Sequence, residues 1–334
     1  MRTRTRAAGV LLSLIGLTAI GTTSAVASTV PDDAGAPWTF VDDMGTTVET
    51  PERPERIVMF EDVAASLMDF GVRPVGIHYI QADGNALFDG LDLDGIESVG
   101  ANCETINVEA VAALEPDLIV YMNWGETDDA AFCLESNQRR QLEEFAPVLQ
   151  MRAEGSADEI LARYAELAEA LGADLESADV VAKREGYEAA SERLATAIAE
   201  RPEISIIPLS VSPDYFGIAE PTGFADLVTL QDRYGVEFVG PFDPDEFTAT
   251  YWQEYSAELA TTFRGDVMLM DAKNATPLAA KLDAFPLWAA LPEVAAGQIV
   301  PWFVPGSFSY TRDAAFMDSL AGAIETAEDF VPEE

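Results

Sequence analysis

Short apolar runs alternate with amphipathic helical segments through the first half of the chain. The runs occupy 57–60, 74–77, 118–121 and 148–151, and the helical segments occupy 62–70, 108–114 and 137–145. Ahead of them, 38–50 has two extended segments around the turn Asp43-Met44-Gly45, which predicts a β-hairpin. Strands that alternate with helices predict a parallel sheet covered by helices on both faces.

The middle of the chain has a purely helical pattern. Ser156-Ala-Asp-Glu159 is a capping box, which starts a helix that runs to Gly172. A second helix extends from a cap at Asp174 to about Glu200, just before a proline. Because each helical residue adds 1.5 Å, roughly 26 residues make a rod of about 40 Å.

The alternation of strands and helices resumes after this rod. The predicted strands are 204–209, 267–270 and 299–302, and the predicted helices are 223–234, 251–263 and 314–328. Glu109 precedes Asp117 by eight residues, as Glu258 precedes Asp266, and each Asp opens a buried-type strand. This repeat indicates that the two halves of the chain have the same arrangement of strands and helices.

These patterns predict an α/β fold with two Rossmann-like lobes of mainly parallel sheets, joined by one long α-helix, with a ligand cleft between the lobes. The predicted divisions are a signal peptide at 1–27, an N-terminal lobe at 28–155, a helical segment at 156–201 and a C-terminal lobe at 202–334.

The N-terminus has every element of a signal peptide. Arg2, Arg4 and Arg6 precede an apolar stretch at 9–20, and Ala25-Val26-Ala27 is an A-x-A cleavage site. The apolar stretch is shorter than the roughly 20 residues that span a bilayer. A short membrane anchor is the alternative. We therefore expect the mature chain to be exported, to the periplasm, the cell envelope or the extracellular space.

The charge is strongly negative. The chain has 59 Asp and Glu against 19 Lys and Arg, a net charge of −40. Binding to phosphates requires a cationic surface, so nucleic acid is excluded as a partner and an anionic membrane surface is disfavoured. Such a charge favours solubility and says little about the fold.

Cys103 and Cys133 are the two cysteines. In an oxidising compartment, one disulfide between them is the simplest expectation, and two unpaired thiols are the alternative. A thiolate metal site is disfavoured because the chain has a single histidine, His78.

Three stretches carry a resemblance to a known family. They are 41–58, 107–120 and 286–300, within a likeness that covers roughly 38–328. The chain resembles the class III substrate-binding proteins of ABC importers, which carry ferric siderophores, cobalamin and haem. Many relatives have a lipobox cysteine at the cleavage site. This chain has no cysteine before Cys103, so a lipid anchor is not expected.

Ligands of open α/β sheets bind beyond the carboxyl ends of the strands. Aromatic residues are frequent at these positions and suit a bulky, partly apolar chelate. Packing in the core is the alternative for each of them, and we assign Trp288 to the core. The candidate ligand-binding residues are Phe60, Glu61, His78, Tyr79, Trp124, Tyr215, Phe216, Lys273, Trp302, Tyr310 and Arg312.

Cations are scarce, so each candidate is informative. Arg312 and Lys273 could meet an anionic chelate, whereas Arg139 and Arg140 lie among glutamates on a predicted helix and favour a solvated surface. A lone histidine such as His78 is more often a core residue than a metal or haem ligand. A chelate that brings its own donor atoms needs no metal ligand and no cofactor from the protein.

The resemblance implies a second functional surface. In the family, one acidic residue per lobe docks onto arginines of the membrane permease, and the matching positions are Glu109 and Glu258. Glu254, one helical turn earlier, is an alternative to Glu258. Solvated glutamates at helix starts are the other interpretation of both residues.

The resemblance therefore implies a monomeric binding protein that captures a ferric siderophore and delivers it to an ABC permease. Cobalamin and haem are the alternative ligands. We do not expect an enzyme, because the sequence has no G-x-S-x-G, no H-E-x-x-H and no glycine-rich phosphate loop. A secreted enzyme or an adhesive surface protein would lack saturable binding of a small ligand.

Overall fold

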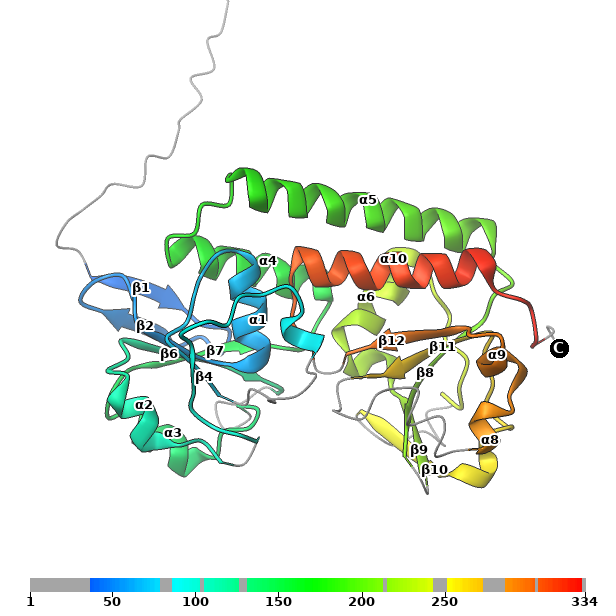
Figure 1. The fold of residues 1–334 in the computed structure, drawn as a ribbon, viewed down its shortest axis with the longest axis horizontal. Helices are drawn as coiled ribbons and strands as arrows, with labels where there is room; N and C mark the ends of the chain where they lie inside the picture. Colours follow the sequence, from blue (N-terminus) through cyan, green and yellow to red (C-terminus); the bar gives the residue numbers. More distant parts are fainter. Residues whose placement is uncertain are drawn as a thin grey trace, which may run out of the picture. The chain divides into compact units, whose positions relative to one another are not determined.

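Two five-stranded sheets organise the chain (Figure 1). The computed structural model describes residues 37–78, 86–102, 105–125, 131–212, 215–242, 251–272, 286–303 and 306–331. The predicted signal peptide lies outside these ranges. No helix within them combines the length and the apolar character needed to cross a membrane.

The first sheet is parallel throughout, in the order β5-β4-β3-β6-β7. Its strands are β3 (Ile57–Phe60), β4 (Gly76–His78), β5 (Glu97–Ser98), β6 (Leu118–Asn123) and β7 (Val148–Arg152). The helices of this N-lobe are α1 (Glu61–Asp69), the 3-10 turn η1 (Ala86–Phe88), α2 (Val108–Ala113) and α3 (Ser136–Leu142). The predicted hairpin is also confirmed, as β1 (Trp38–Val41) paired with β2 (Thr47–Thr50).

The second sheet has the order β10-β9-β8-β11-β12. Strands β8 (Ile206–Val211), β11 (Val267–Asp271) and β12 (Ile299–Trp302) are parallel, whereas β9 (Tyr215–Ala219) and β10 (Trp252–Ser256) are antiparallel. The helical elements of this C-lobe are η3 (Pro221–Gly223), α6 (Ala225–Tyr234), η4 (Ala257–Leu259), α8 (Pro286–Ala289), α9 (Pro292–Ala295) and α10 (Tyr310–Thr326).

The predicted helix at 251–263 is wrong. This segment begins with β10, which pairs with β9 so that Glu254 lies opposite Gly217. Trp252 packs over that glycine, where an added Cβ would lie 3.1 Å from the indole. Cross-strand packing on a small residue therefore outweighs the helical spacing of Glu254 and Glu258.

Two helices connect the lobes in sequence. The capping box at Ser156 is confirmed: its Oγ accepts a hydrogen bond from Glu159 N at 3.3 Å and starts α4 (Ala157–Ala170). The next helix, α5 (Ala178–Glu200), begins after Ser177 and not after Asp174, which caps the preceding turn. Its 23 residues make a rod of about 35 Å. Helix α10 runs alongside α5 (Figure 1), and Arg193 of α5 pairs with Glu325 of α10.

The sequence repeat corresponds to a structural one. Asp117, just before β6, accepts hydrogen bonds from the backbone N–H groups of Glu55 and Arg56, just before β3. Asp266, just before β11, accepts from the backbone N–H and hydroxyl of Ser205, just before β8. Since β6 pairs with β3 and β11 pairs with β8, the two aspartates lock equivalent strand pairs at their amino ends.

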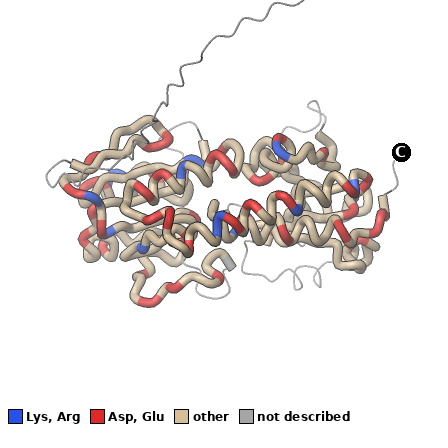
Figure 2. Tube along the Cα trace, turned by 90° about the horizontal axis from the view of Figure 1, so that it is seen from above, with Lys and Arg blue, Asp and Glu red and all other residues tan. Residues whose placement is uncertain are grey.

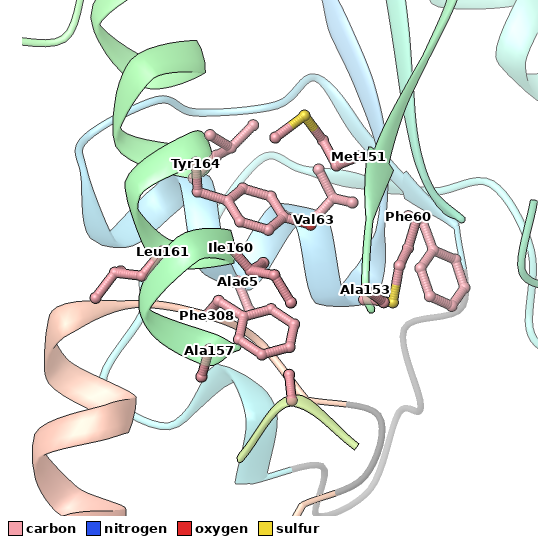
Figure 3. Packing of buried hydrophobic residues seen from close by; sticks show 14 of the residues in the cluster. Phe60, Val63, Ala65, Met151, Ala153, Ala157, Ile160, Leu161, Tyr164 and Phe308 are labelled. Carbon is pink, nitrogen blue, oxygen red and sulfur yellow. The ribbon is translucent and has the colours of Figure 1, made fainter. Parts of the chain in front are cut away.

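Buried side chains from both halves meet beneath α4. Figure 3 shows Tyr164 of α4 beside Phe308, which precedes α10; the two rings stack with centroids 6.3 Å apart. Ser66 of α1 reinforces this contact, because its Oγ accepts a hydrogen bond from Phe308 N at 2.9 Å. The start of α10 is thereby fixed against the N-lobe.

Candidate functional site

A cavity of about 350 Å³ lies where the two lobes meet. Its N-lobe wall includes Leu87 and Leu91 after β4, and its C-lobe wall includes Phe303 after β12 and Phe316 of α10. Ligand pockets commonly measure about 300–1,000 Å³ and combine apolar walls with a few polar groups. The hydroxyls of Ser307, Ser309, Thr311 and Ser319 also line this cavity.

An aromatic cluster bridges the lobes next to the end of β6. Trp124, half-buried, places its ring 5.4 Å from Tyr251 and 5.9 Å from Phe224, both of the C-lobe. Tyr251 also donates its hydroxyl to Glu154 of the N-lobe at 3.2 Å. The predicted position of Trp124 at a strand end is therefore also a point of contact between the lobes.

Arg312 lines the cavity but is already engaged by carboxylates. Its guanidinium donates to both oxygens of Asp226, at 2.8 and 2.7 Å, and to Asp313 Oδ1 at 2.7 Å. Trp302 Nε1–H donates to the same Asp226 at 2.9 Å. Burial raises the pKa of Asp313 to about 7, against the opposing effect of Arg312. Arg312 thus joins α6, β12 and α10 and has a structural partner instead of a free charge.

His78 is a core histidine. Its Nε2 lies 3.2 Å from the carbonyl oxygen of Asn102, so Nε2–H donates there and Nδ1 accepts from the Tyr121 hydroxyl at 2.7 Å. Burial lowers the pKa of His78 to about 4, although the bond to Asn102 opposes the shift. The imidazole is therefore neutral at pH 7, and both of its nitrogens are occupied by protein groups.

Five of the predicted ligand contacts are core side chains. Phe60, Glu61, His78, Phe216 and Trp302 have no exposed surface. Phe216 packs against Trp288, 5.2 Å away in a second core cluster, and this confirms the assignment of Trp288 to the core. All five are enclosed by the protein in this structure, and their direct contact with a ligand stays a prediction.

The remaining candidates have different surroundings. Tyr215 starts β9 and is 44% exposed. Tyr310 starts α10 and packs between Phe70 and Tyr187, at 5.4 and 5.7 Å, so it contacts helices of the protein itself. Tyr79 and Lys273 lie outside the described residues.

The two predicted docking glutamates are both exposed. Glu109 lies in the first turn of α2, whose N-cap is Asn107, and Glu258 lies in the single turn η4. Glu254, the alternative, is exposed on β10. Exposure is what docking requires, and it is also what a solvated glutamate shows, so the docking role stays a prediction.

Cys133 is disulfide-bonded and follows the aromatic residue Phe132. Cys103 lies outside the described residues, so its pairing with Cys133 stays a prediction. Within the described ranges, no cluster of three or more His, Cys, Asp or Glu side chains could hold a metal ion.

A larger cavity of about 730 Å³ lies at the opposite edge of the C-lobe sheet, near the start of β8. Its two arginines, Arg201 and Arg264, pair with Glu203 and Glu293. Because ligands of such sheets bind at the carboxyl ends of the strands, we assign the site to the smaller cavity between the lobes.

Sequence reasoning missed several residues of this junction, among them Leu87, Phe224 and Tyr251. Tyr251 was hidden inside the wrongly predicted helix. Phe224 was placed inside the predicted helix 223–234, whereas it is the N-cap residue that precedes α6. Phe303 follows Trp302, and the pattern gave no means to tell which of the two side chains faces the cavity.

Comparisons with known proteins agree with this architecture. A model of the family described as periplasmic binding protein matches residues 97–302. The chain is 39% identical over 80 residues to the probable siderophore-binding lipoprotein YfiY of Bacillus subtilis (strain 168). That match covers 23% of this chain and 24% of YfiY, so it spans about a quarter of the curated relative.

The similarity to solved structures extends much further. DesE, a ferric-siderophore receptor protein from Streptomyces coelicolor, is 30% identical, with a TM-score of 0.80 over 88% of this chain and 99% of DesE. The siderophore periplasmic binding protein from the fuscachelin gene cluster of Thermobifida fusca shares the fold at 20% identity, with a TM-score of 0.59 over 82% of this chain and 98% of that one. The resemblance inferred from the sequence is confirmed, and the chain belongs to the periplasmic binding protein family.

Proposed function

We propose that this protein captures a ferric siderophore outside the cytoplasm and delivers it to the permease of an ABC importer. The similarity to DesE, a ferric-siderophore receptor protein, carries this proposal, because it extends over 88% of the chain at 30% identity. The short match to YfiY points to the same ligand class.

The junction between the lobes supports the same function. A cavity of about 350 Å³ with apolar walls and hydroxyl groups adjoins both lobes, and the Trp124 cluster presents aromatic rings from each. Flat aromatic surfaces favour a bulky ligand that is partly apolar. Iron arrives already coordinated by the siderophore, so the protein does not have to supply metal ligands.

Haem and cobalamin are the alternative ligands within the family. Haem typically needs an axial ligand such as His or Tyr. His78 does not fit this role because it is fully buried and both of its nitrogens are hydrogen-bonded. These contacts argue against His78 as an axial ligand and support a ferric siderophore over a histidine-ligated haem.

The proposed partner is an ABC permease, with Glu109 and Glu258 as the docking residues of a monomeric binding protein. Their exposure at the start of α2 and in η4 supports this assignment. Charged groups at such a surface mainly set the rate and orientation of docking.

Titration of tryptophan fluorescence tests the ligand. Ferric siderophores, cobalamin and haem are each added to the full mature chain, with the iron-free siderophores as controls. We expect saturable quenching by at least one ferric siderophore, with weaker or no saturation by the iron-free form. Saturable binding of cobalamin or haem alone, with no response to any ferric siderophore, would contradict the proposal.

A further inference from the structure

The cavity between the lobes has an acidic lining among the residues that the structure describes. Asp69 and Asp89 line it, together with one cation, Arg312. Asp226 already neutralises that cation, since both of its carboxylate oxygens accept hydrogen bonds from the guanidinium, and Asp313 accepts a further one. Arg312 therefore offers little attraction to an anionic ligand.

The two cavity carboxylates differ in their availability. Asp69 accepts hydrogen bonds from Thr311 N and Oγ1, at 3.2 and 2.7 Å, and pairs with Lys183 at 3.3 Å. Asp89 is exposed and forms no ion pair with any residue that the structure describes. Asp89 is thus a free negative charge at the rim of the cavity.

The aromatic cluster around Trp124 also favours a cationic ligand over an anionic one. Tyr251, which faces Trp124, is hydrogen-bonded to the carboxylate of Glu154. Aromatic faces attract cations through the ring quadrupole, and a nearby carboxylate strengthens that attraction. An anionic ligand in contact with this cluster would meet both the ring electrons and the carboxylate.

The net charge of the whole molecule also favours cations over anions. The chain has 59 acidic and 19 basic side chains, and Figure 2 shows Asp and Glu on elements of both lobes, with far fewer Lys and Arg. A field of this sign raises the local concentration of cations and slows the approach of anions.

We propose that this protein selects ferric chelates whose net charge is zero or positive, and that Asp89 favours a chelate with a protonated amine. The inference rests on the proposed function and specifies its ligand class. Fe³⁺ bound by three hydroxamates is neutral, and an ammonium tail makes the chelate +1. Three catecholates leave Fe³⁺ with a net charge of −3.

Three ferric chelates test the selection by charge. They are ferrioxamine B, which is a trihydroxamate with a terminal ammonium, its N-acetylated form, which is neutral, and a trianionic tris-catecholate. The first two share one coordination sphere and differ by a single charge. Fluorescence titrations at about 20 mM and about 500 mM salt span a wide range of screening lengths.

We expect the cationic chelate to bind about threefold more tightly than the neutral one at low salt, the size of one weakly screened charge–charge contact. The tris-catecholate should bind at least tenfold more weakly than either. At high salt, the difference between the two trihydroxamates should vanish.

Asp89→Asn should remove the preference for the ammonium and leave the neutral chelate within about twofold of the wild type. Asp329→Asn, an exposed aspartate close to the C-terminus, is the matched control and should change neither affinity. Tighter binding of the trianionic chelate than of the other two overturns the inference while the proposed function stands. Equal affinity for both trihydroxamates, unchanged in Asp89→Asn, overturns the role of Asp89. Failure of every ferric chelate to bind overturns the proposed function itself.

Discussion

Tyr121 and His78 share a hydrogen bond of 2.7 Å between the phenol oxygen and Nδ1, and neither side chain has any exposed surface. Together with the contact to Asn102, this bond satisfies the whole imidazole inside the N-lobe core. A protonated imidazole could not accept the Tyr121 hydrogen bond, so the core requires the neutral form.

We predict that acid weakens the fold through His78. Its pKa is about 4 in the folded protein, against an ordinary value near 6.5 when unfolded. The unfolded chain therefore binds the extra proton first, and stability falls as pH drops from about 6.5 to 4, by about 3 kcal/mol at most. His78 is the only histidine, so its single imidazole signal in an NMR titration gives the folded pKa directly. A midpoint near 6.5 would contradict this prediction.

Asp313 should make the stability of the fold depend on pH in the opposite direction. Burial raises its pKa to about 7, so the folded protein holds this proton where the unfolded chain has lost it. Stability should therefore fall as pH rises from about 4 to 7. The groups that act on it include Arg312, Asp226 and Asp158. In Asp313→Asn, melting temperatures between pH 5 and 8 should show a flatter decline.

The control for this measurement is Asp318→Asn on the same helix, where the carboxylate pairs with Arg193 at the surface. It should retain the decline of the wild type. If Asp313→Asn and Asp318→Asn have the same pH profile, the buried carboxylate does not hold the proton.

We predict that Trp124 contributes mainly to ligand binding and Trp302 mainly to the stability of the fold. Trp124→Ala should weaken ferric siderophore binding at least about tenfold, or 1.4 kcal/mol, because its half-buried ring belongs to the aromatic cluster between the lobes. Trp302→Ala should instead lower the free energy of unfolding by about 3–5 kcal/mol, since the indole is fully buried and donates to Asp226. Denaturant melts and titrations on both variants make the comparison. Wild-type affinity in Trp124→Ala would remove this residue from the site.

Loss of the docking glutamates should impair transport and leave ligand binding intact. Glu109→Ala combined with Glu258→Ala should keep chelate affinity within about twofold and reduce uptake several-fold in vesicles that contain the permease. The defect should depend on salt, because exposed ion pairs are screened. A matched control is Glu185→Ala on α5, which is also exposed. Uptake that equals this control would leave both residues as ordinary surface acids.

Regular elements with strong local signals could be predicted from the sequence. The capping box of Ser156 joins residues three positions apart, and the strands β3, β6 and β11 are continuous apolar runs that stand out in the sequence. The hairpin of β9 and β10 could not be predicted in this way, because Gly217 and Trp252 meet only after the sheet has formed.

The candidate site was less accessible to sequence reasoning. Topology placed Trp302 and Phe303 at the correct end of the sheet, yet only Phe303 lines the cavity, and Trp302 faces the core. A shift of one residue reverses the face of a strand, and pattern analysis does not locate strand ends to that accuracy. Arg312 lines the cavity, but its partner Asp226 is 86 residues away in the chain.

The hydrogen bonds from Phe308 and Thr311 to Ser66 and Asp69 connect residues 242 positions apart. A ribosome that adds about 5–20 residues per second needs roughly 12–50 s to cover that distance. During this interval Ser66 and Asp69 of α1 lack these two partners, and Tyr164 lacks the ring that stacks on it. The N-terminal half therefore reaches its final packing only after nearly the whole chain has been synthesised. Such late, non-local closure slows folding and extends the time during which the N-terminal half stays incompletely packed.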